Sequence, residues 1–218
     1  MKSMRSKKSL SKKGLLYAIL DEKTLQSRNN MLATADKLAR YGTDILQFRA
    51  KDISDSTFLS IALDLEKIIH KQGKCFIVND RADIAHLSGA DGLHLGDNDI
   101  PVSSARKLLG KNKFIGKTVH SDCEMKSFKN EDIDYLSFGP VFKTQTKDIP
   151  VTLTPCKISR IIKQTDKLIF AIGGINLYNI KSLIKMNINN VAVCRGLVKA
   201  NDLKRTVRGY KLCLAKAF

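Results

Sequence analysis

Residues 45–78 read ILQFRAKDISDSTFLSIALDLEKIIHKQGKCFIV, and this stretch decides the fold class. Short apolar runs at 45–48 and 76–78 enclose a segment with an apolar stripe at steps of three and four, made of Phe58, Ile61, Ala62, Leu65, Ile68 and Ile69. Continuous apolar runs are typical of strands buried on both faces, and the stripe is typical of an amphipathic helix. Ser54 and Ser56 are candidate N-caps, and Gly73 is a stop signal. The stretch therefore predicts a strand–helix–strand unit with parallel strands.

The same alternation extends along the whole chain. Eight candidate strands lie at 15–20, 45–48, 76–78, 92–95, 114–119, 135–138, 168–172 and 191–194. Helical spacing also occurs at 32–39 and 203–214, and shorter helices are expected near 81–88 and 122–129. Eight strand–helix repeats favour a closed barrel over an open sheet, so we predict an α/β fold, a single (β/α)8 TIM barrel. We assign residues 14–218 to this one domain and residues 1–13 to a basic head that we expect to be disordered.

Composition limits the class of protein. The chain has 218 residues, near the lower end of about 200 to 400 for such barrels. No apolar run approaches the roughly 18 residues that cross a bilayer, and the head lacks the apolar core of a secretory signal. Five widely spaced cysteines match neither a disulfide framework nor a metal site. We therefore expect a cytoplasmic protein with reduced thiols and no membrane partner.

The net charge is +17, with 38 Lys and Arg against 21 Asp and Glu. Six of the positive residues lie in the head, at Lys2, Arg5, Lys7, Lys8, Lys12 and Lys13. The others are scattered along the sequence without a nucleic-acid motif or interleaved aromatic residues. We interpret most of this charge as solvated surface and expect no nucleic-acid partner, although a functional basic patch is the alternative. A positive field would also suit an anionic small-molecule substrate.

Nearly every apolar run ends in polar or glycine residues that a core does not require. In a (β/α)8 barrel these ends meet at one mouth, where the active site is built. Gln47, Arg49 and Lys51 alternate and so point to one side of their strand. The other strand ends carry Asp21, Asn79-Asp80, Asp97, Asp99, Thr118, His120, Gly139-Pro140, Thr144, Thr146, Lys147, Gly173-Gly174 and Arg195-Gly196.

These groups suggest a site for two phosphorylated ends. Asp80 and Asp99 can hold Mg²⁺, which prefers oxygen ligands and substrate phosphates. The cations Arg49, Lys51 and Lys147 can neutralise a diphosphate. Gly173-Gly174 and Arg195-Gly196 end the last two strands, where such barrels often bind phosphate through backbone N–H groups.

Each feature also has a simpler interpretation. A Gly-Gly pair is usually a turn, and Asn79-Asp80 could cap the next helix. His120 is either an acid/base group or a residue at a helix start. We interpret His70, His86 and His94 as structural, because they show no ligand spacing.

Together the motifs resemble a known family. The segments QFRAK at 47–51, VNDR at 78–81, ADGLHLG at 90–96, DIP at 99–101, GPVF at 139–142, TQTK at 144–147 and AIGGI at 171–175 closely resemble signature stretches of thiamin phosphate synthases. The resemblance runs from about residue 16 to residue 197, and the superfamily also contains the thiazole tautomerases.

The resemblance implies a Mg²⁺-dependent transferase of thiamin biosynthesis. Such an enzyme joins a pyrimidine diphosphate to a thiazole phosphate, or its carboxylate, and releases diphosphate. Ionisation of the C–O bond gives a pyrimidine-stabilised cation that the thiazole nitrogen captures. Its partners are small-molecule substrates, and a homo-oligomer is compatible with the sequence.

Carried over by motif, the site residues fall into three groups. Asp80 and Asp99 should bind Mg²⁺, and the catalytic cations Arg49, Lys51 and Lys147 should hold the diphosphate. Gln47 and Asn79 should contact the pyrimidine or its diphosphate. Thr118, where the family usually has Ser, and His120 are further expected substrate-binding residues. The thiazole phosphate should lie against Thr144, Thr146, Gly173, Gly174, Arg195 and Gly196.

The sequence departs from the family pattern in four places. One is the segment 148–155, which lacks the glycine-containing turn that normally follows the Thr-Lys pair. Lys143 stands in place of a Pro, Asp97 in place of a Gln, and Arg195 in place of a small residue, commonly Ser. A thiazole tautomerase is the nearest rival to the synthase; it would use a histidine at position 120 and would need neither diphosphate nor metal. A paralogue that binds a different phosphorylated ligand is a second rival, and a non-enzymatic nucleic-acid-binding protein is a third.

Overall fold

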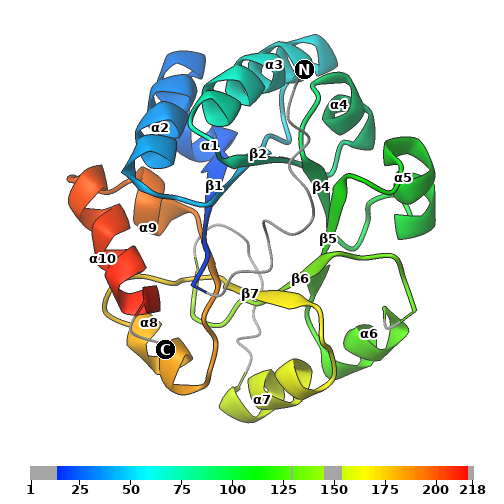
Figure 1. Cartoon of the computed structure of the whole chain (residues 1–218), viewed down its shortest axis with the longest axis vertical. Coiled ribbons are helices and arrows are strands. Elements are labelled where there is room, and N and C mark those ends of the chain that lie inside the picture. The colour runs from blue at the N-terminus through cyan, green and yellow to red at the C-terminus, as the bar shows by residue number, and fades with distance from the viewer. Residues whose placement is uncertain (1–13, 129, 145–153, 216–218) are drawn as a thin grey trace.

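Eight parallel strands form a closed barrel in the computed structural model, which describes residues 14–128, 130–144 and 154–215 (Figure 1). The strands follow one another around the barrel in sequence order. They are β1 (Leu16–Asp21), β2 (Ile45–Arg49), β3 (Cys75–Asn79), β4 (Gly92–Leu95), β5 (Phe114–Val119), β6 (Tyr135–Phe138), β7 (Leu168–Ile172) and β8 (Val191–Val193). Pairing of Ala18 in β1 with Val193 in β8 closes the ring. The predicted (β/α)8 barrel is therefore confirmed.

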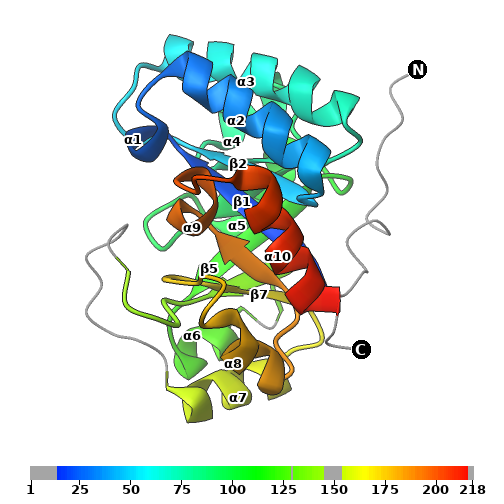
Figure 2. The same cartoon turned by 90° about the vertical axis from the view of Figure 1, so that its left-hand side faces the viewer.

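Helices surround the barrel (Figures 1 and 2). They are α1 (Glu22–Leu25), α2 (Arg28–Tyr41), α3 (Asp55–Lys71), α4 (Ala82–Leu87), α5 (Val102–Leu109), α6 (Asp122–Ser127), α7 (Pro155–Lys163), α8 (Ile180–Lys185), α9 (Arg195–Val198) and α10 (Leu203–Ala215). In Figure 2 the arrow of β8 points to the left, toward the face of the barrel at which the strands end.

Strand alternation divides the core into two apolar clusters. In β1, Tyr17 and Ile19 belong to the cluster inside the barrel, whereas Leu16, Ala18 and Leu20 belong to the cluster between strands and helices. Successive side chains of a strand point to opposite faces, so an unbroken apolar run supplies both clusters at once. This requirement explains why the strands were visible in the sequence as continuous apolar runs.

The predicted strand boundaries hold to within one residue, whereas α2 begins four residues before the predicted helical spacing. Ser54 caps α3 by accepting a hydrogen bond from the Thr57 N–H, at 3.3 Å. Ser56, the other candidate cap, lies inside the helix instead. Gly42 ends α2 in the left-handed region with φ of 113°, a conformation that glycine adopts without strain. The weak helices near 81–88 and 122–129 correspond to α4 and α6.

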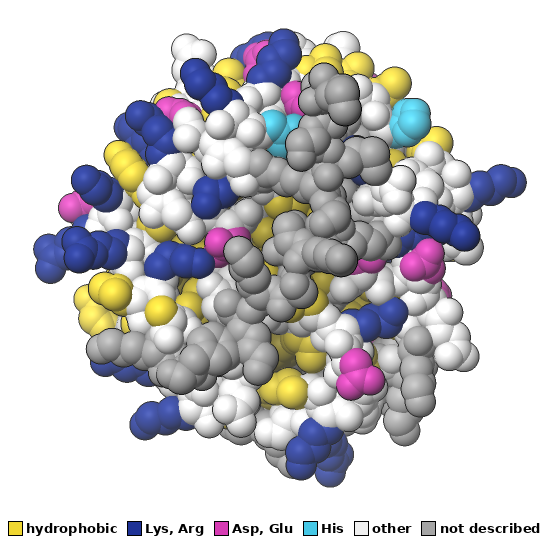
Figure 3. All heavy atoms as spheres, in the orientation of Figure 1, with side chains coloured by type: hydrophobic (Ala, Val, Ile, Leu, Met, Phe, Trp, Pro, Cys, Tyr) yellow, Lys and Arg dark blue, Asp and Glu magenta, His cyan; other side chains and the backbone are white. Residues whose placement is uncertain are grey.

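Two further sequence expectations can be compared with the structure. Among the residues that the structure describes, no helix has both the length and the apolarity to cross a membrane. The thiols of Cys75, Cys194 and Cys213 are free. On the face drawn in Figure 3, Lys and Arg side chains lie at many separate places around the edge of the view.

Candidate active site

Two adjoining cavities open where the strands end. The larger has a volume of about 590 Å³, and its lining includes residues from the ends of β1, β2, β7 and β8. The smaller, of about 150 Å³, is lined by Arg49, Lys51, Asn79, Asp80, His94, Gly96, Asp97, Asn98, Asp99 and Thr118. Arg49, Asn79, His94 and Thr118 line both cavities, so they form the wall that the two share.

The smaller cavity contains a pair of neighbouring carboxyl groups. Asp80 follows β3 with φ of 65°, and its N–H donates to the His94 carbonyl oxygen at 2.8 Å. Burial, followed by a hydrogen bond with the Asp99 carboxyl, raises the pKa of Asp80, and the ion pair with the Lys51 ammonium opposes that rise. Asp99 is held in turn by the Gly96 N–H, at 2.5 Å. Two carboxyls and one lysine are thus concentrated where a substrate end can enter.

The donor set of this cavity fits Mg²⁺. Across the described part of the chain, no group of three or more His, Cys, Asp or Glu residues is arranged to bind a metal. Magnesium, however, commonly uses only one or two protein carboxylates and completes its shell with water and substrate phosphate oxygens. Asp80 and Asp99 supply such a pair, and a divalent cation would remove the repulsion that disfavours charge on both carboxylates.

Arg49 lies between the cavities and is held by Asp21. The two side chains form an ion pair at 2.6 Å, and they are 18% and 4% exposed. The Asp21 carboxylate also caps α1 by accepting from the Thr24 N–H at 3.1 Å and the Thr24 hydroxyl at 2.8 Å. The guanidinium therefore has a fixed position in the wall of both cavities.

A buried polar network forms the floor of the larger cavity. The Gln47 amide donates to the Tyr17 hydroxyl at 2.8 Å, and the Tyr17 and Tyr135 hydroxyls lie 3.0 Å apart. His94 continues the chain, with Nδ1 at 3.1 Å from the Tyr135 hydroxyl and Nε2 at 2.9 Å from the Thr118 hydroxyl. Burial raises the pKa of both tyrosines, so their hydroxyls stay protonated.

Four members of this neighbourhood were not proposed from the sequence: Tyr17, Tyr135, His94 and Ser137. His94, interpreted as structural, lines both cavities. The sequence carried part of the signal, because strand alternation points His94 away from the side of Leu93 and Leu95. The structure places Leu93 and Leu95 beneath the helices, so His94 faces the barrel interior.

His120 follows β5 at the edge of the larger cavity. Its Nδ1 donates to the Gly139 carbonyl oxygen at 2.7 Å, and its Nε2 lies 3.2 Å from an Asp97 carboxylate oxygen. Its backbone N–H donates to Glu124 at 2.7 Å, which joins it to the start of α6. Both ring nitrogens thus already have protein partners.

The other end of the larger cavity is shaped by two glycines. Gly173 and Gly174 have φ of 98° and 63°, in the left-handed region. A Cβ on Gly173 would lie 2.5 Å from the Pro140 Cβ, and one on Gly174 would lie 2.4 Å from the Lys143 carbonyl oxygen. Any side chain would therefore collide with the β6–α7 connection, and only glycine lets the two backbones approach so closely.

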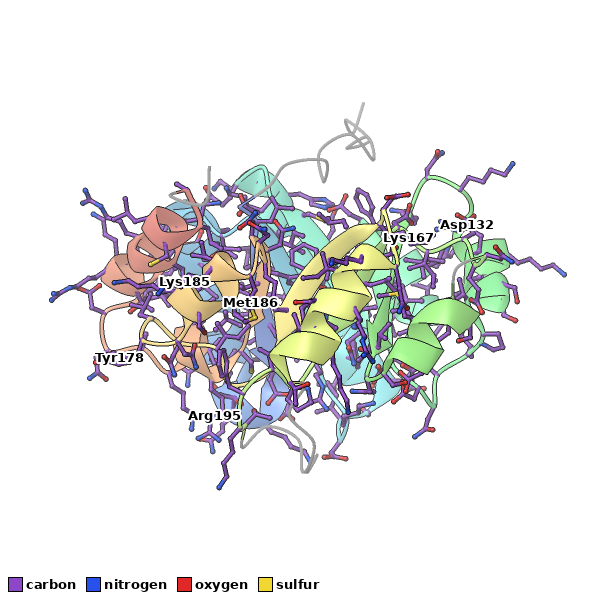
Figure 4. The ribbon with its side chains drawn as sticks, turned by 90° about the horizontal axis from the view of Figure 1, so that it is seen from below. Asp132, Lys167, Tyr178, Lys185, Met186 and Arg195 are labelled. Atoms are coloured by element: carbon purple, nitrogen blue, oxygen red, sulfur yellow. The ribbon has the colours of Figure 1, made fainter. Side chains whose placement is uncertain are left out.

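Cations surround this glycine-lined end. Arg195, Lys143 and Lys199 all line the larger cavity. Arg195 begins α9, and in Figure 4 it lies at the lower edge of the molecule. The departure from a small residue at position 195 thus puts a guanidinium at the cavity mouth, where it can contact an anionic group.

The structure brings together all the predicted site residues that it describes. The larger cavity contains Gln47, Arg49, Asn79, Thr118, His120, Thr144, Gly173, Gly174, Arg195 and Gly196. The smaller contains Lys51, Asp80 and Asp99. Thr146 and Lys147 lie outside the described residues.

These features define a class of protein. A (β/α)8 barrel whose strand ends carry a carboxylate pair beside Arg and Lys, and a cationic, glycine-lined cavity, has the general layout of a barrel enzyme with its site at this face. The chain belongs to the thiamine monophosphate synthase family, whose model matches residues 16–197.

Individual relatives agree with that assignment. The chain is 38% identical over 196 residues to a thiamine-phosphate synthase of Prochlorococcus marinus. These residues are 90% of the chain but 54% of the relative. It is 35% identical over 209 residues to a thiamine-phosphate synthase of Clostridioides difficile. These residues are 96% of the chain and 99% of the relative. The chain thus spans about half of the first relative and nearly all of the second. A thiamine phosphate pyrophosphorylase from Pyrococcus furiosus shares the fold, with a TM-score of 0.83, 24% identity, and 94% and 97% of the chains covered.

Proposed function

We propose that the chain is a thiamin phosphate synthase, a transferase that joins a pyrimidine diphosphate to a thiazole phosphate and releases diphosphate. One observation carries the proposal: a carboxylate-containing cavity and a glycine-lined cavity adjoin and share a polar wall. Two substrates, each with a phosphorylated end, can then place their reacting atoms against that wall. Holding two reactants in this way accounts for much of the rate enhancement expected of such a site.

The smaller cavity is assigned to the diphosphate. Asp80 and Asp99 would hold Mg²⁺, which when bound neutralises charge on the leaving group. Arg49 and Lys51 project from β2 and the residues after it, and they add two further positive charges beside the carboxylates. Lys147 is assigned to the same end from its motif alone. Stabilising the departing charge is the main catalytic contribution that these residues can make.

The shared wall is assigned to the pyrimidine. Gln47, Asn79 and Thr118 offer amide and hydroxyl groups to a heterocycle. The hydrogen-bonded floor keeps the Gln47 amide and the Thr118 hydroxyl in place, because each is bonded to a buried neighbour. His94 supports Thr118 from the same floor, so we add it to the residues that position the pyrimidine.

The glycine-lined end is assigned to the thiazole phosphate. Gly173 and Gly174 leave room for an anion close to the backbone, and Arg195 and Gly196 follow from the last strand. Thr144 lies in the same lining, and Thr146 is assigned beside it by motif. Two phosphorylated ends would thus be bound by different means, one with a metal ion and one without.

The alternative tautomerase would require His120 to move a proton of the substrate. Both His120 nitrogens already contact protein acceptors, the Gly139 carbonyl and the Asp97 carboxylate. A tautomerase would also have no use for the carboxylate pair beside Lys51. These two observations favour the synthase. We further place the protein in the cytoplasm, since free thiols such as Cys75 and Cys213 are typical of reducing compartments.

A product assay tests the function. The full chain is incubated with the pyrimidine diphosphate, the carboxylated or decarboxylated thiazole phosphate, and Mg²⁺, and thiamin monophosphate is separated by chromatography. We expect product with the unaltered chain and a loss of about 100-fold or more in Asp80→Ala and Asp99→Ala. Asp52→Ala is the matched control, because Asp52 is an exposed carboxylate paired with Lys23.

His120→Ala separates the two family activities. It should retain most of the synthase activity, whereas loss of function in this variant alone would point to the tautomerase. Failure of the folded, unaltered chain to form product beside a working control enzyme would contradict the proposed function.

A further inference from the structure

The positive charge of this protein is unevenly distributed along the chain. Residues 14–153 contain nineteen Lys and Arg and nineteen Asp and Glu, and so are balanced. Residues 154–218 contain thirteen Lys and Arg against two acidic residues, Asp166 and Asp202. Outside the head, the whole basic excess therefore belongs to the last 65 residues.

The fold gathers this excess on one side of the barrel. Helices α7, α8 and α10 lie side by side in both Figures 1 and 2. Six of their exposed basic residues form a set that we call the basic face: Lys157, Lys181, Lys185, Lys204, Arg205 and Arg208. Residues that are far apart in the sequence thus lie on neighbouring helices.

The basic face also lacks the ion pairs that neutralise cations elsewhere. Arg28 pairs with Asp64, Arg40 with Asp36, and Arg106 with Asp134. Within the described ranges, the structure forms no ion pair to any of the six residues of the basic face. A surface with this much uncompensated charge attracts polyanions.

An aromatic ring lies at the edge of the basic face. Tyr178 is 96% exposed, although tyrosine usually buries much of its ring. Its N–H donates to the Asn176 side chain at 2.9 Å, and the preceding Leu177 lies against Gly209 of α10. The loop is therefore anchored to the protein while the ring points into solvent. Figure 4 shows Tyr178 at the outer edge of the molecule, on the same side as Lys185.

We propose that the basic face binds single-stranded nucleic acid, with Lys and Arg contacting phosphates and Tyr178 stacking on a base. Cations that follow a backbone, combined with an exposed aromatic ring, are the features of such sites. An anionic membrane fits less well, because peripheral helices insert several large apolar side chains. Among the described residues of α7, α8 and α10, Leu212 alone is a large apolar side chain that is exposed. The proposal departs from the sequence-based expectation of no nucleic-acid partner.

Fluorescence anisotropy with a labelled 20-nucleotide oligouridine tests the proposal on the full chain. At physiological salt we expect a Kd of about 10⁻⁴ to 10⁻⁶ M, with an affinity that falls steeply as salt rises. The quadruple variant Lys181→Glu, Lys185→Glu, Arg205→Glu, Arg208→Glu should lose at least about tenfold in affinity. Tyr178→Ala should lose about fivefold or more, the lower end of what stacking of one base contributes.

A control variant separates the basic face from net charge. The changes Lys67→Glu, Lys71→Glu, Lys107→Glu and Lys111→Glu alter the same number of exposed basic residues on or next to α3 and α5. These helices lie away from α8 and α10 (Figure 1). This variant should bind within about twofold of the unaltered chain. Circular dichroism confirms that each variant is folded.

Several outcomes would overturn the proposal. Equal losses in both quadruple variants would mean that net charge alone attracts RNA. No loss in Tyr178→Ala would remove the stacking contact. Loss of binding when the six basic residues of the head are replaced by Gln would move the site to residues 1–13. Binding to phosphatidylserine vesicles without binding to oligouridine would favour a membrane surface.

Discussion

Replacing Arg49 separates the structural role of this residue from its catalytic role. Arg49→Met keeps the length of the side chain and removes its charge, which leaves the 4% exposed Asp21 carboxylate without its cation. Removing one partner of a buried ion pair costs about 3 to 5 kcal/mol. Because Asp21 keeps two hydrogen bonds from Thr24, we expect the lower end, about 3 kcal/mol. For a protein of this size that loss lowers the Tm by about 6 to 12 °C.

Adding Asp21→Asn provides the test. The double variant no longer buries an unpaired charge, and Asn still caps α1, so its stability should return to within about 1 kcal/mol of the unaltered chain. Its synthase activity should stay reduced by about 100-fold or more, because the diphosphate has lost a cation. Urea unfolding gives the free energies, and the thiamin monophosphate assay gives kcat/KM. A double variant that regained both stability and turnover would show that Arg49 acts only through Asp21.

Three shorter predictions address other parts of the molecule. Gly174→Ala should raise the KM for the thiazole phosphate by about tenfold or more, because the new Cβ would lie 2.4 Å from the Lys143 carbonyl oxygen; an unchanged KM in steady-state assays would argue against this phosphate pocket. Asp80→Asn should raise the Tm of the metal-free protein, because the raised pKa of Asp80 means that the charged form of its carboxyl is disfavoured in the fold. In this variant Mg²⁺ should no longer raise the Tm. A Tm below that of the unaltered chain, or a Tm that still rises with Mg²⁺, would contradict the prediction. The hydrogen bond to Asp91 raises the pKa of His70, so its stabilising contribution is complete below about pH 6.5 and is lost as pH rises through the folded-state pKa; urea unfolding between pH 6 and 9 should show a decline that His70→Gln makes shallower, and parallel profiles would refute it.

The strands could be predicted because the strands of a parallel barrel are buried on both faces and therefore appear in the sequence as continuous apolar runs. Each strand is covered on both faces, so β5 and β6 coincide with apolar runs at 114–119 and 135–138. The mouth could also be predicted, since parallel strands end together. Lys51, Asp80 and Asp99 are distant in sequence and line one cavity.

The cavity floor could not be predicted in the same way. Tyr17 and Tyr135 lie 118 positions apart, and each stands in an apolar run where a tyrosine resembles any other core aromatic. Only the closure of the barrel brings their hydroxyls to 3.0 Å and makes them part of a polar network. His94 was missed for a related reason, because its role depends on which side of β4 faces inward.

The basic face shows the same limit at the surface. In the sequence, Lys181, Lys185 and Arg205 look like ordinary solvated charges on separate helices. Their helices α8 and α10 become neighbours only through the order of helices around the closed barrel (Figure 2). From the sequence alone these basic residues are interpreted as scattered, because the sequence does not show that their helices are neighbours in the fold.

The central claim is that one mouth holds two phosphorylated ends and that only one of them needs a metal. Calorimetric titration of the full chain with each substrate separately, with and without Mg²⁺, tests it most directly. We predict that the pyrimidine diphosphate binds at least about tenfold more tightly with Mg²⁺, and that Asp80→Asn abolishes the difference. The thiazole phosphate should bind equally well in both conditions. Tight pyrimidine diphosphate binding without Mg²⁺, or a thiazole phosphate that requires the metal, would contradict the assignment of the two cavities.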